Sequence, residues 1–186
     1  MSQNLKLCTT ISVLIVLFIC PDASAQRTMK GQSAPSLSAV RTDSSFGGEI
    51  TYNQYTLVGM WNAGARVSDY TLATTTEYPI EAIQITATSS YLGRIAATRS
   101  RRLNLYGGGG IFLGYEFLDP FKKLPDHIIP ESKDGCFVYG ILAKTELELF
   151  LSRQFAIVGT ATIPINFQSQ TGWFHWEAGI GIRINI

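Results

Sequence analysis

Six charged residues in the second half of the sequence are the side chains best suited to do chemistry. They are Glu116, Lys144, Glu146, Glu148, Glu177 and Arg183. Side chains on a β-strand alternate between its two faces, so residues two apart, such as Glu146 and Glu148, lie on one face. We expect all six on the inner, polar face of a closed sheet. Charges in a dry interior must pair, because an unpaired buried charge is costly.

Two interpretations of this charged set remain open. The first is a structural network of ion pairs that makes the interior rigid. The second is a gated path for protons or ions through that interior. His175 lies next to the set, at the expected outer rim, and a single histidine there is typical of a satisfied polar group.

The sequence carries no recognisable catalytic or metal-binding motif. Its two histidines are His127 and His175, and no serine stands in a Gly-x-Ser-x-Gly pattern. Beyond residue 25 the remaining cysteine is Cys136, which permits no internal disulfide and no zinc ligand set. The balance of 15 Lys+Arg against 14 Asp+Glu argues against a protein built around a nucleic acid. We therefore expect no catalytic residue, no metal, no cofactor and no direct nucleic-acid binding.

The segment 173–186 indicates the kind of element that positions these charges. Its even positions, from Phe174 to Ile186, are all apolar, whereas its odd positions from His175 onwards are small or polar. That period of two predicts one long strand. Strands of soluble sheets usually have about 5–6 residues, and a membrane-spanning strand needs roughly 9–11. The length of the pattern favours a strand that crosses a membrane.

The same alternation predicts eight strands joined by hairpins. They cover 33–40, 55–63, 70–78, 83–92, 103–117, 137–149, 155–167 and 173–186, with a loop over 42–51, turns over 62–69, 93–102 and 152–153, and a long loop over 118–135. Outer-membrane barrels show this asymmetry of short periplasmic turns and longer outside loops. The prediction is all-β: an eight-stranded antiparallel up-and-down outer-membrane β-barrel. A soluble periplasmic barrel or sandwich is the alternative, and the Gly, Thr and Ser of the second face favour a narrow barrel interior instead.

Residues 1–25 have the pattern of a cleaved secretory signal peptide. Lys6 precedes an apolar stretch over 11–20, which is too short to span a bilayer, and Ala23-Ser24-Ala25 offers a cleavage site. The barrel domain is then expected over 26–186, in the outer membrane and in contact with its lipid.

The mature sequence also resembles a known family. The resemblance is carried by the motifs Met29-Lys30-Gly31, Gly114-Tyr115-Glu116, Phe137-Val138-Tyr139-Gly140, Leu151-Ser152-Arg153, Thr171-Gly172-Trp173-Phe174-His175 and Gly179-Ile180-Gly181, with Gly107-Gly108 and Glu146-Leu147-Glu148. Together they are similar to the TraO family of conjugative-transposon transfer proteins, from Bacteroidetes-type elements. The resemblance implies an envelope component of a conjugative mating apparatus, with other transfer proteins as partners and no enzymatic residues.

The turn predicted over 93–102 is the candidate docking site. It carries Arg94, Arg99, Arg101 and Arg102, and by the strand count it faces the periplasm. An eight-stranded barrel is just wide enough inside for side chains, so DNA cannot thread it and any role in transfer lies on the surface. We expect these arginines to dock acidic groups of partner proteins; the alternative is a solvated turn whose charges only aid orientation. Two other functions remain: a stand-alone adhesin or structural barrel that recognises through 118–135, and a lipid-modifying enzyme with a Ser/His pair.

Overall fold

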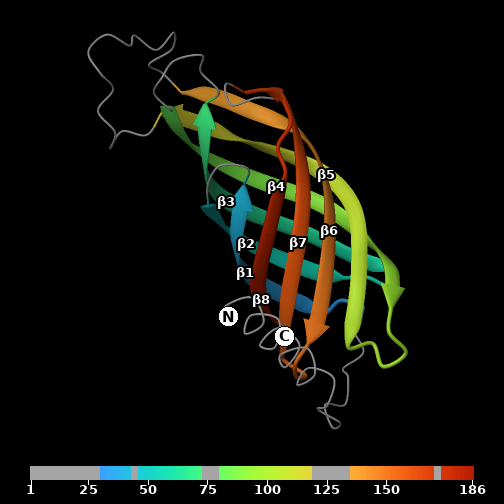
Figure 1. Ribbon diagram of the computed structural model, residues 1–186. Helices are drawn as coiled ribbons and strands as arrows, with labels where there is room; N and C mark the ends of the chain where they lie inside the picture. The colour runs from blue at the N-terminus through green and yellow to red at the C-terminus, as the bar shows by residue number, and fades with distance from the viewer. Residues whose placement is uncertain (1–29, 43–45, 73–79, 119–134, 170–172) are drawn as a thin grey trace, which may run out of the picture.

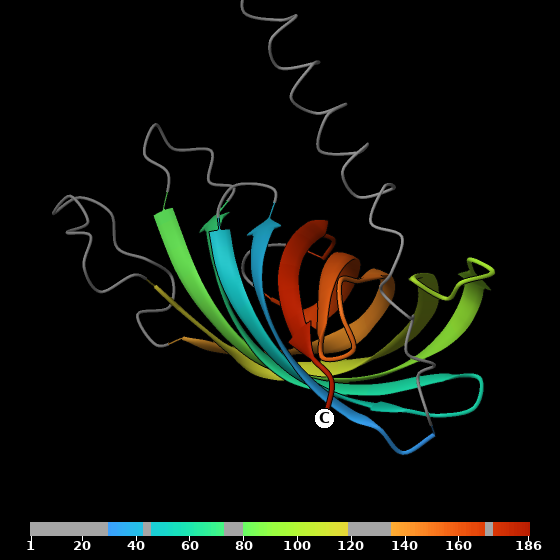
Figure 2. The same cartoon turned by 90° about the horizontal axis from the view of Figure 1, so that it is seen from below.

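The fold is one antiparallel sheet that curls round and closes on itself (Figures 1 and 2). The computed structural model describes residues 30–42, 46–72, 80–118, 135–169 and 173–186. The strands are β1 (Ser33–Thr42), β2 (Phe46–Tyr55), β3 (Gly59–Leu72), β4 (Ile80–Ala97), β5 (Leu103–Leu118), β6 (Cys136–Phe150), β7 (Phe155–Gln168) and β8 (Glu177–Ile184). The predicted eight-stranded antiparallel barrel is therefore confirmed.

Each strand pairs with the next one in the chain, and β8 pairs with β1 to close the barrel. The closing register sets Ser36 opposite Arg183 and Leu37 opposite Ile182. The Ile186 amide donates to the Ser33 carbonyl at 2.9 Å, so the two ends of the described chain meet at one end of the barrel. Closure leaves no unpaired strand edge among the eight strands, which is the condition for a sheet to stand in lipid.

Side chains alternate between an apolar outside and a polar inside. Along β6 the odd positions from Phe137 to Leu147 are exposed, and the even positions from Val138 to Phe150 are buried. On β8, Ile180 is 66% exposed and Ile182 59%, whereas Arg183 is 0% exposed. The apolar face thus points out of the barrel, which rules out the alternative of a soluble barrel with an apolar core.

Glycines on the inner face let neighbouring strands and side chains come close. A Cβ at Gly181 would overlap Ser38 Oγ and the Leu37 carbonyl. A Cβ at Gly140 would overlap the Ile165 carbonyl and press on the Phe112 ring. The glycine-rich inner face that was noted in the sequence is therefore a consequence of a crowded interior.

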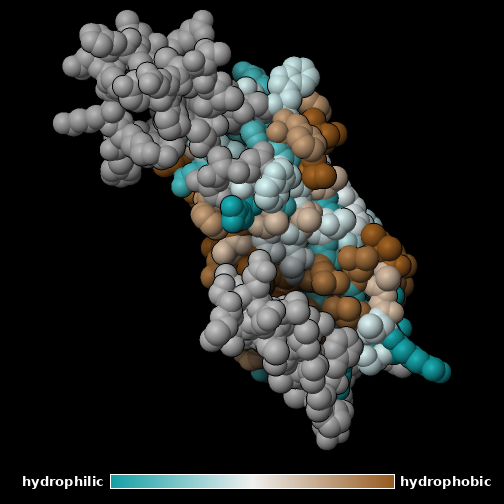
Figure 3. All heavy atoms as spheres, in the orientation of Figure 1, coloured by the Kyte–Doolittle hydropathy of each residue, from teal (hydrophilic) through white to brown (hydrophobic). Residues whose placement is uncertain are grey.

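Aromatic residues ring the outer wall near both ends. Near the end where the chain ends meet, the exposed rings are Tyr52, Trp61 and Phe155. Near the opposite end they are Phe46, Tyr115, Phe137, Tyr139, Phe167, Trp173, Phe174 and Trp176. On the face seen in Figure 3, hydrophobic residues form patches on the wall between the two ends. Two aromatic girdles around an apolar band are the pattern of a membrane-spanning barrel.

The two ends of the barrel differ in their connections. The end with residues 30–32 and 185–186 also carries the short connections 56–58, 98–102 and 151–154, and we name it the terminal end. The connections 43–45, 73–79, 119–135 and 169–176 belong to the opposite end, which we name the loop end. Outer-membrane barrels have short turns at their periplasmic end and longer loops at the outside end, and the short connections of this barrel lie at the terminal end.

The number of strands was predicted correctly, but several boundaries in the first half were wrong. The segment 42–51, predicted as a loop, contains most of β2, and β3 runs through the predicted turn at 62–69. The segment 55–63, predicted as one strand, is divided instead: Tyr55 ends β2, and β3 begins at Gly59. The reason is that Asn62 and Ser68 are buried inside the barrel, so residues that favour turns were facing the interior.

The last strand is shorter than predicted. It covers Glu177–Ile184, and residues 173–176 precede it, with one isolated bridge between Phe174 and Ile165. The predictions for 1–25, and for 119–134 within the long loop, concern residues outside the described part. No helix of the described residues is long and apolar enough to span a membrane.

The outward position of Ile180 can be tested with a charge. Arginine on the lipid-facing side costs about 2–4 kcal/mol at the bilayer midplane and about 0–1 near the interface. We expect Ile180→Arg to lower the free energy of unfolding by about 2 kcal/mol or more. The measurement is urea unfolding in lipid vesicles, together with the gel shift between unboiled and boiled samples.

The matched control is Gln54→Arg, at an exposed position at the terminal end of β2. It should change the stability little. Equal stability of Ile180→Arg and Gln54→Arg would contradict the assigned facing.

Candidate functional site: the barrel interior and the terminal-end rim

A layer of apolar and tyrosine side chains fills the interior near the terminal end. We name it the plug; its members are Ala34, Tyr55, Met60, Leu92 and Tyr106, all at most 2% exposed. The rings of Tyr55 and Tyr106 lie 6.5 Å apart. These residues come from β1 to β5, so side chains from more than half the wall meet there.

Arg183 forms the charged cluster next to the plug. One of its guanidinium nitrogens, Nη1, lies 2.6 Å from Glu146 Oε1 and 3.0 Å from Glu148 Oε1. Tyr55 donates its hydroxyl proton to Glu148, and Tyr106 donates to the other oxygen of the same carboxylate at 3.4 Å. We name this set the Arg183 cluster; it joins β2, β5, β6 and β8.

A second cluster lies nearer the loop end and contains two ion pairs. Arg66 pairs with Glu177, which also accepts a hydrogen bond from the Tyr70 hydroxyl at 2.7 Å. Lys144 lies 3.1 Å from Glu49. Arg66 and Glu49 are direct neighbours across β2 and β3, so the two pairs are adjacent. We name these five residues the Glu177 cluster.

Neutral polar groups add to the charged ones. Asn53 donates to the Ala34 carbonyl at 2.9 Å and accepts a hydrogen bond from Asn62 at 2.6 Å. Nearer the loop end, Glu116 accepts hydrogen bonds from Ser169 at 2.8 Å and from Gln84 at 3.5 Å. The interior is therefore cross-linked along much of its length.

The structure brings together five of the six charged residues that were predicted from the sequence. Lys144, Glu146, Glu148, Glu177 and Arg183 belong to the two clusters, and Glu116 lies apart from them with its own hydrogen bonds. All six are at most 3% exposed.

Sequence reasoning missed the partners supplied by the first half of the chain. They are Glu49, Tyr55, Arg66 and Tyr70, together with Tyr106 of β5. Glu49 was assigned to a loop and Arg66 to a turn. Correct boundaries for β2 and β3 would have placed both inside, because Glu49 precedes the outward-facing Ile50 and Arg66 precedes the outward-facing Val67.

The predicted arginine turn is shorter than expected and does not contain Arg94. Strand β4 continues to Ala97, with an irregularity between Arg94 and Ala96. Arg94 is half-buried and sits opposite Tyr106, which faces the interior. Arg99 and Arg101 are exposed in the turn 98–102, whereas Arg102 is half-buried.

The turn 98–102 has a defined backbone geometry. The Arg101 amide donates to the Thr98 carbonyl at 2.8 Å, and the Thr98 amide donates to the Leu103 carbonyl at 2.9 Å. Arg101 has φ 54°, in the left-handed region that non-glycine residues seldom adopt. The chain thus holds an arginine where glycine would be less strained.

The other candidate residues that the structure describes are His175 and Cys136. The His175 ring packs on Tyr70, with centroids 4.9 Å apart, and the Cys136 thiol lies 3.6 Å from the Phe137 carbonyl. Within the described residues, no three His, Cys, Asp or Glu side chains gather as a metal site would require. His127 lies outside the described part.

The closed sheet, the aromatic girdles and the ion-paired interior define the class: an outer-membrane-type β-barrel of eight strands. The conjugative transposon protein TraO family model matches residues 25–186. The chain belongs to the TraO family. The family resemblance that was noted in the sequence is thereby confirmed.

Solved structures support the fold. OprG of Pseudomonas aeruginosa matches with a TM-score of 0.55 and 9% identity, over 89% of this chain and 99% of that one. The N-terminal barrel domain of P. aeruginosa OprF matches with a TM-score of 0.50 and 12% identity, over 84% of this chain and 98% of that one. Ail of Yersinia pestis, in complex with the heparin analogue sucrose octasulfate, matches with a TM-score of 0.50 and 14% identity, over 85% of this chain and 100% of that one. A comparison with curated protein sequences found no match.

The charge balance of the Arg183 cluster can be tested by removing and restoring it. Removing one partner of a buried ion pair costs about 3–5 kcal/mol, because the other charge stays buried and unpaired. We expect Arg183→Met to lower the free energy of unfolding by that order in urea unfolding experiments.

The compensated variant Arg183→Met with Glu146→Gln and Glu148→Gln carries no unpaired charge in this cluster. It should recover much of the lost stability. A compensated variant as unstable as Arg183→Met alone would show that shape, and not charge, sets the role of Arg183.

The filled interior predicts that the barrel does not conduct. An aqueous channel takes about 16–18 strands, whereas this eight-stranded interior is occupied by the plug and both clusters. In a planar bilayer the purified protein should show no stable conductance steps. A large and stable conductance of the monomer would contradict a closed interior.

Proposed function

We propose that this protein is a non-enzymatic outer-membrane component of a conjugative DNA-transfer apparatus, and that it acts by docking other transfer proteins at its periplasmic end. Membership of the TraO family supports the link with conjugation, and the barrel fold supports the outer membrane as its location. The interior ion pairs serve the barrel itself, as a rigid cross-linked support.

The observation that carries the docking role is the charge of the terminal end. Its described connecting residues contain Lys30, Arg99, Arg101, Arg102 and Arg153, and no Asp or Glu. We name these five residues the cationic rim. Arginine forms planar, bidentate bonds with carboxylates, so this rim suits an acidic surface on a partner.

The backbone of the turn 98–102 adds to this argument. A non-glycine residue in the left-handed region costs roughly 1–2 kcal/mol. Arg101 is held there by hydrogen bonds within the turn and is exposed. An exposed arginine in a strained position is a reason to infer a function for its side chain.

The alternatives have less support. The adhesin function depends on 118–135, most of which lies outside the described residues. The lipid-modifying function needs a Ser/His pair; His175 packs against Tyr70.

The docking role is tested by replacing Arg99, Arg101 and Arg102 with Gln together. Hydrogen bonds to charged groups contribute about 1.5–3 kcal/mol each, so losing one or two should lower transfer by tenfold or more. The measurements are transfer frequency between cells and the recovery of other transfer proteins in pull-downs. Outer-membrane fractionation and the gel shift on boiling must show normal assembly.

Two controls separate the explanations. Lys30→Gln removes a rim charge outside the turn and should reduce transfer much less than the triple variant does. Arg101→Gly relieves the backbone strain but removes the side chain, so it should preserve stability and still reduce transfer. Normal transfer by the assembled triple variant would exclude the turn from the mechanism.

A further inference from the structure

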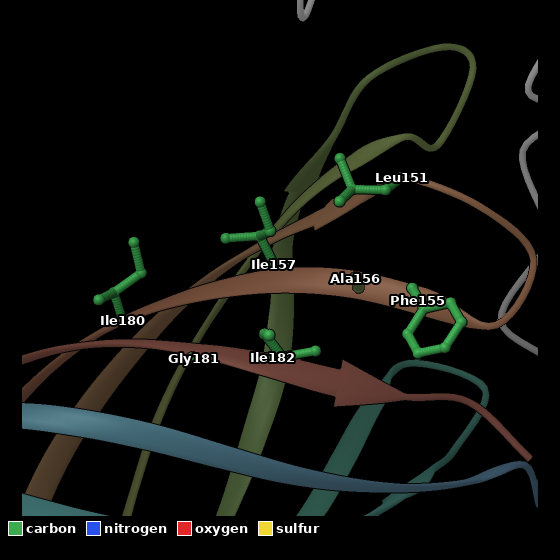
Figure 4. Close-up of a pocket in the computed structure, with 7 residues that line it drawn as sticks. All are labelled: Leu151, Phe155, Ala156, Ile157, Ile180, Gly181 and Ile182. Atoms are coloured by element: carbon green, nitrogen blue, oxygen red, sulfur yellow. The ribbon is translucent and has the colours of Figure 1, made fainter.

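The outer wall has an apolar hollow at the terminal end of β7 and β8. Its volume is about 420 Å³, and it is lined by Leu151, Phe155, Ala156, Ile157, Ile180, Gly181 and Ile182. In Figure 4 the side chains of Leu151, Ile157, Phe155 and Ile182 stand around it, with Ile180 at its far side. The outward-facing Gly159, which pairs with Ile180, leaves open space beyond Ile157.

The dimensions of the hollow fit one acyl chain of a single leaflet. It extends from Phe155, the first residue of β7, to the level of Gly159 and Ile180. Four steps of roughly 3.3 Å give about 13 Å along the strand. Half of a hydrocarbon core of about 30 Å is about 15 Å, so the hollow stays within the periplasmic leaflet.

A cationic turn stands directly beside the hollow. Leu151 lines the hollow, and Arg153 follows it in the connection 151–154, where it is exposed. The neighbouring turn lies alongside, because the Phe150 amide donates to the Arg102 carbonyl at 2.8 Å. Neither connection contains an acidic residue. An apolar slot with arginine at its mouth is complementary to a lipid with an anionic headgroup.

From this arrangement we propose that the hollow between β7 and β8 binds one acidic phospholipid of the periplasmic leaflet. One acyl chain lies against Ile157, Ile180 and Ile182, and the phosphate contacts Arg153. The proposal depends on the outer-membrane location, which is part of the proposed function, but not on any role in conjugation.

A second hollow on the wall is less suited to this ligand. It is lined by Ala39, Val40, Arg41, Phe46, Ala178, Gly179 and Ile180, towards the loop end. The Arg41 guanidinium there lies 5.5 Å from the centre of the Phe46 ring, in a cation–π contact. A phosphate would have to compete with that contact.

Native mass spectrometry of the purified full-length mature protein in detergent tests the proposal. The probes are phosphatidylglycerol and phosphatidylcholine with identical acyl chains. We expect one phosphatidylglycerol per barrel, bound about tenfold more tightly than phosphatidylcholine, as one charge-assisted contact would give. Equal retention of the two lipids by the unmodified protein would overturn the proposal.

Two pairs of variants separate the headgroup from the acyl chain. Arg153→Gln should abolish the preference for phosphatidylglycerol, whereas Arg101→Gln, on the adjacent turn, should keep it. Ile157→Trp should fill the hollow and weaken both lipids, whereas Ile85→Trp, on the outer face of β4 across the barrel, should not. If Arg153→Gln and Arg101→Gln lowered the preference for phosphatidylglycerol equally, the preference would come from the general charge of the rim, and the proposed site would be wrong.

The lipid test and the conjugation test fail independently. The variant Arg153→Lys keeps the charge and should retain the preference for phosphatidylglycerol.

If lipid binding is lost while assembly stays normal, the proposal that partners dock through 98–102 is unaffected. A protein recovered outside the outer membrane would instead contradict the proposed function itself.

Discussion

The closure of the sheet is the constraint on which the rest of the structure depends. Lipid offers no hydrogen bonds to the backbone, so every strand in the wall must pair on both sides. The β1–β8 ladder completes that pairing. Closing with eight strands fixes a narrow interior, and a narrow interior forces inward side chains into contact.

The contacts inside the barrel follow from this crowding. Polar side chains must face inward because the outer positions meet hydrocarbon, and once inside they must satisfy one another. Three cations, Arg66, Lys144 and Arg183, accordingly pair with four of the five described buried glutamates, and tyrosine hydroxyls supply further donors. The network fills the interior and leaves the outer wall and the two ends as the surfaces through which the protein can act.

Those surfaces carry two kinds of chemistry at the terminal end. The exposed arginines of 98–102 are suited to acidic protein groups, while the hollow below 151–154 is suited to a lipid chain. The two turns are adjacent, so a bound lipid headgroup and a docked protein would share one cationic rim.

The sequence by itself determined the barrel class, the outward isoleucines of β8 and the inward charges of the second half, because alternation with period two is a local property. Only the tertiary structure decided where the strands of the first half begin and end. Asn and Ser occur both in turns and in polar interiors, so Asn62 and Ser68 do not distinguish a turn from a strand. The tertiary structure also decided the pairings. Tyr55 and Glu148 are 93 residues apart, Lys144 and Glu49 are 95, and Arg66 and Glu177 are 111. These partners meet only when the sheet closes, so no local pattern could identify them.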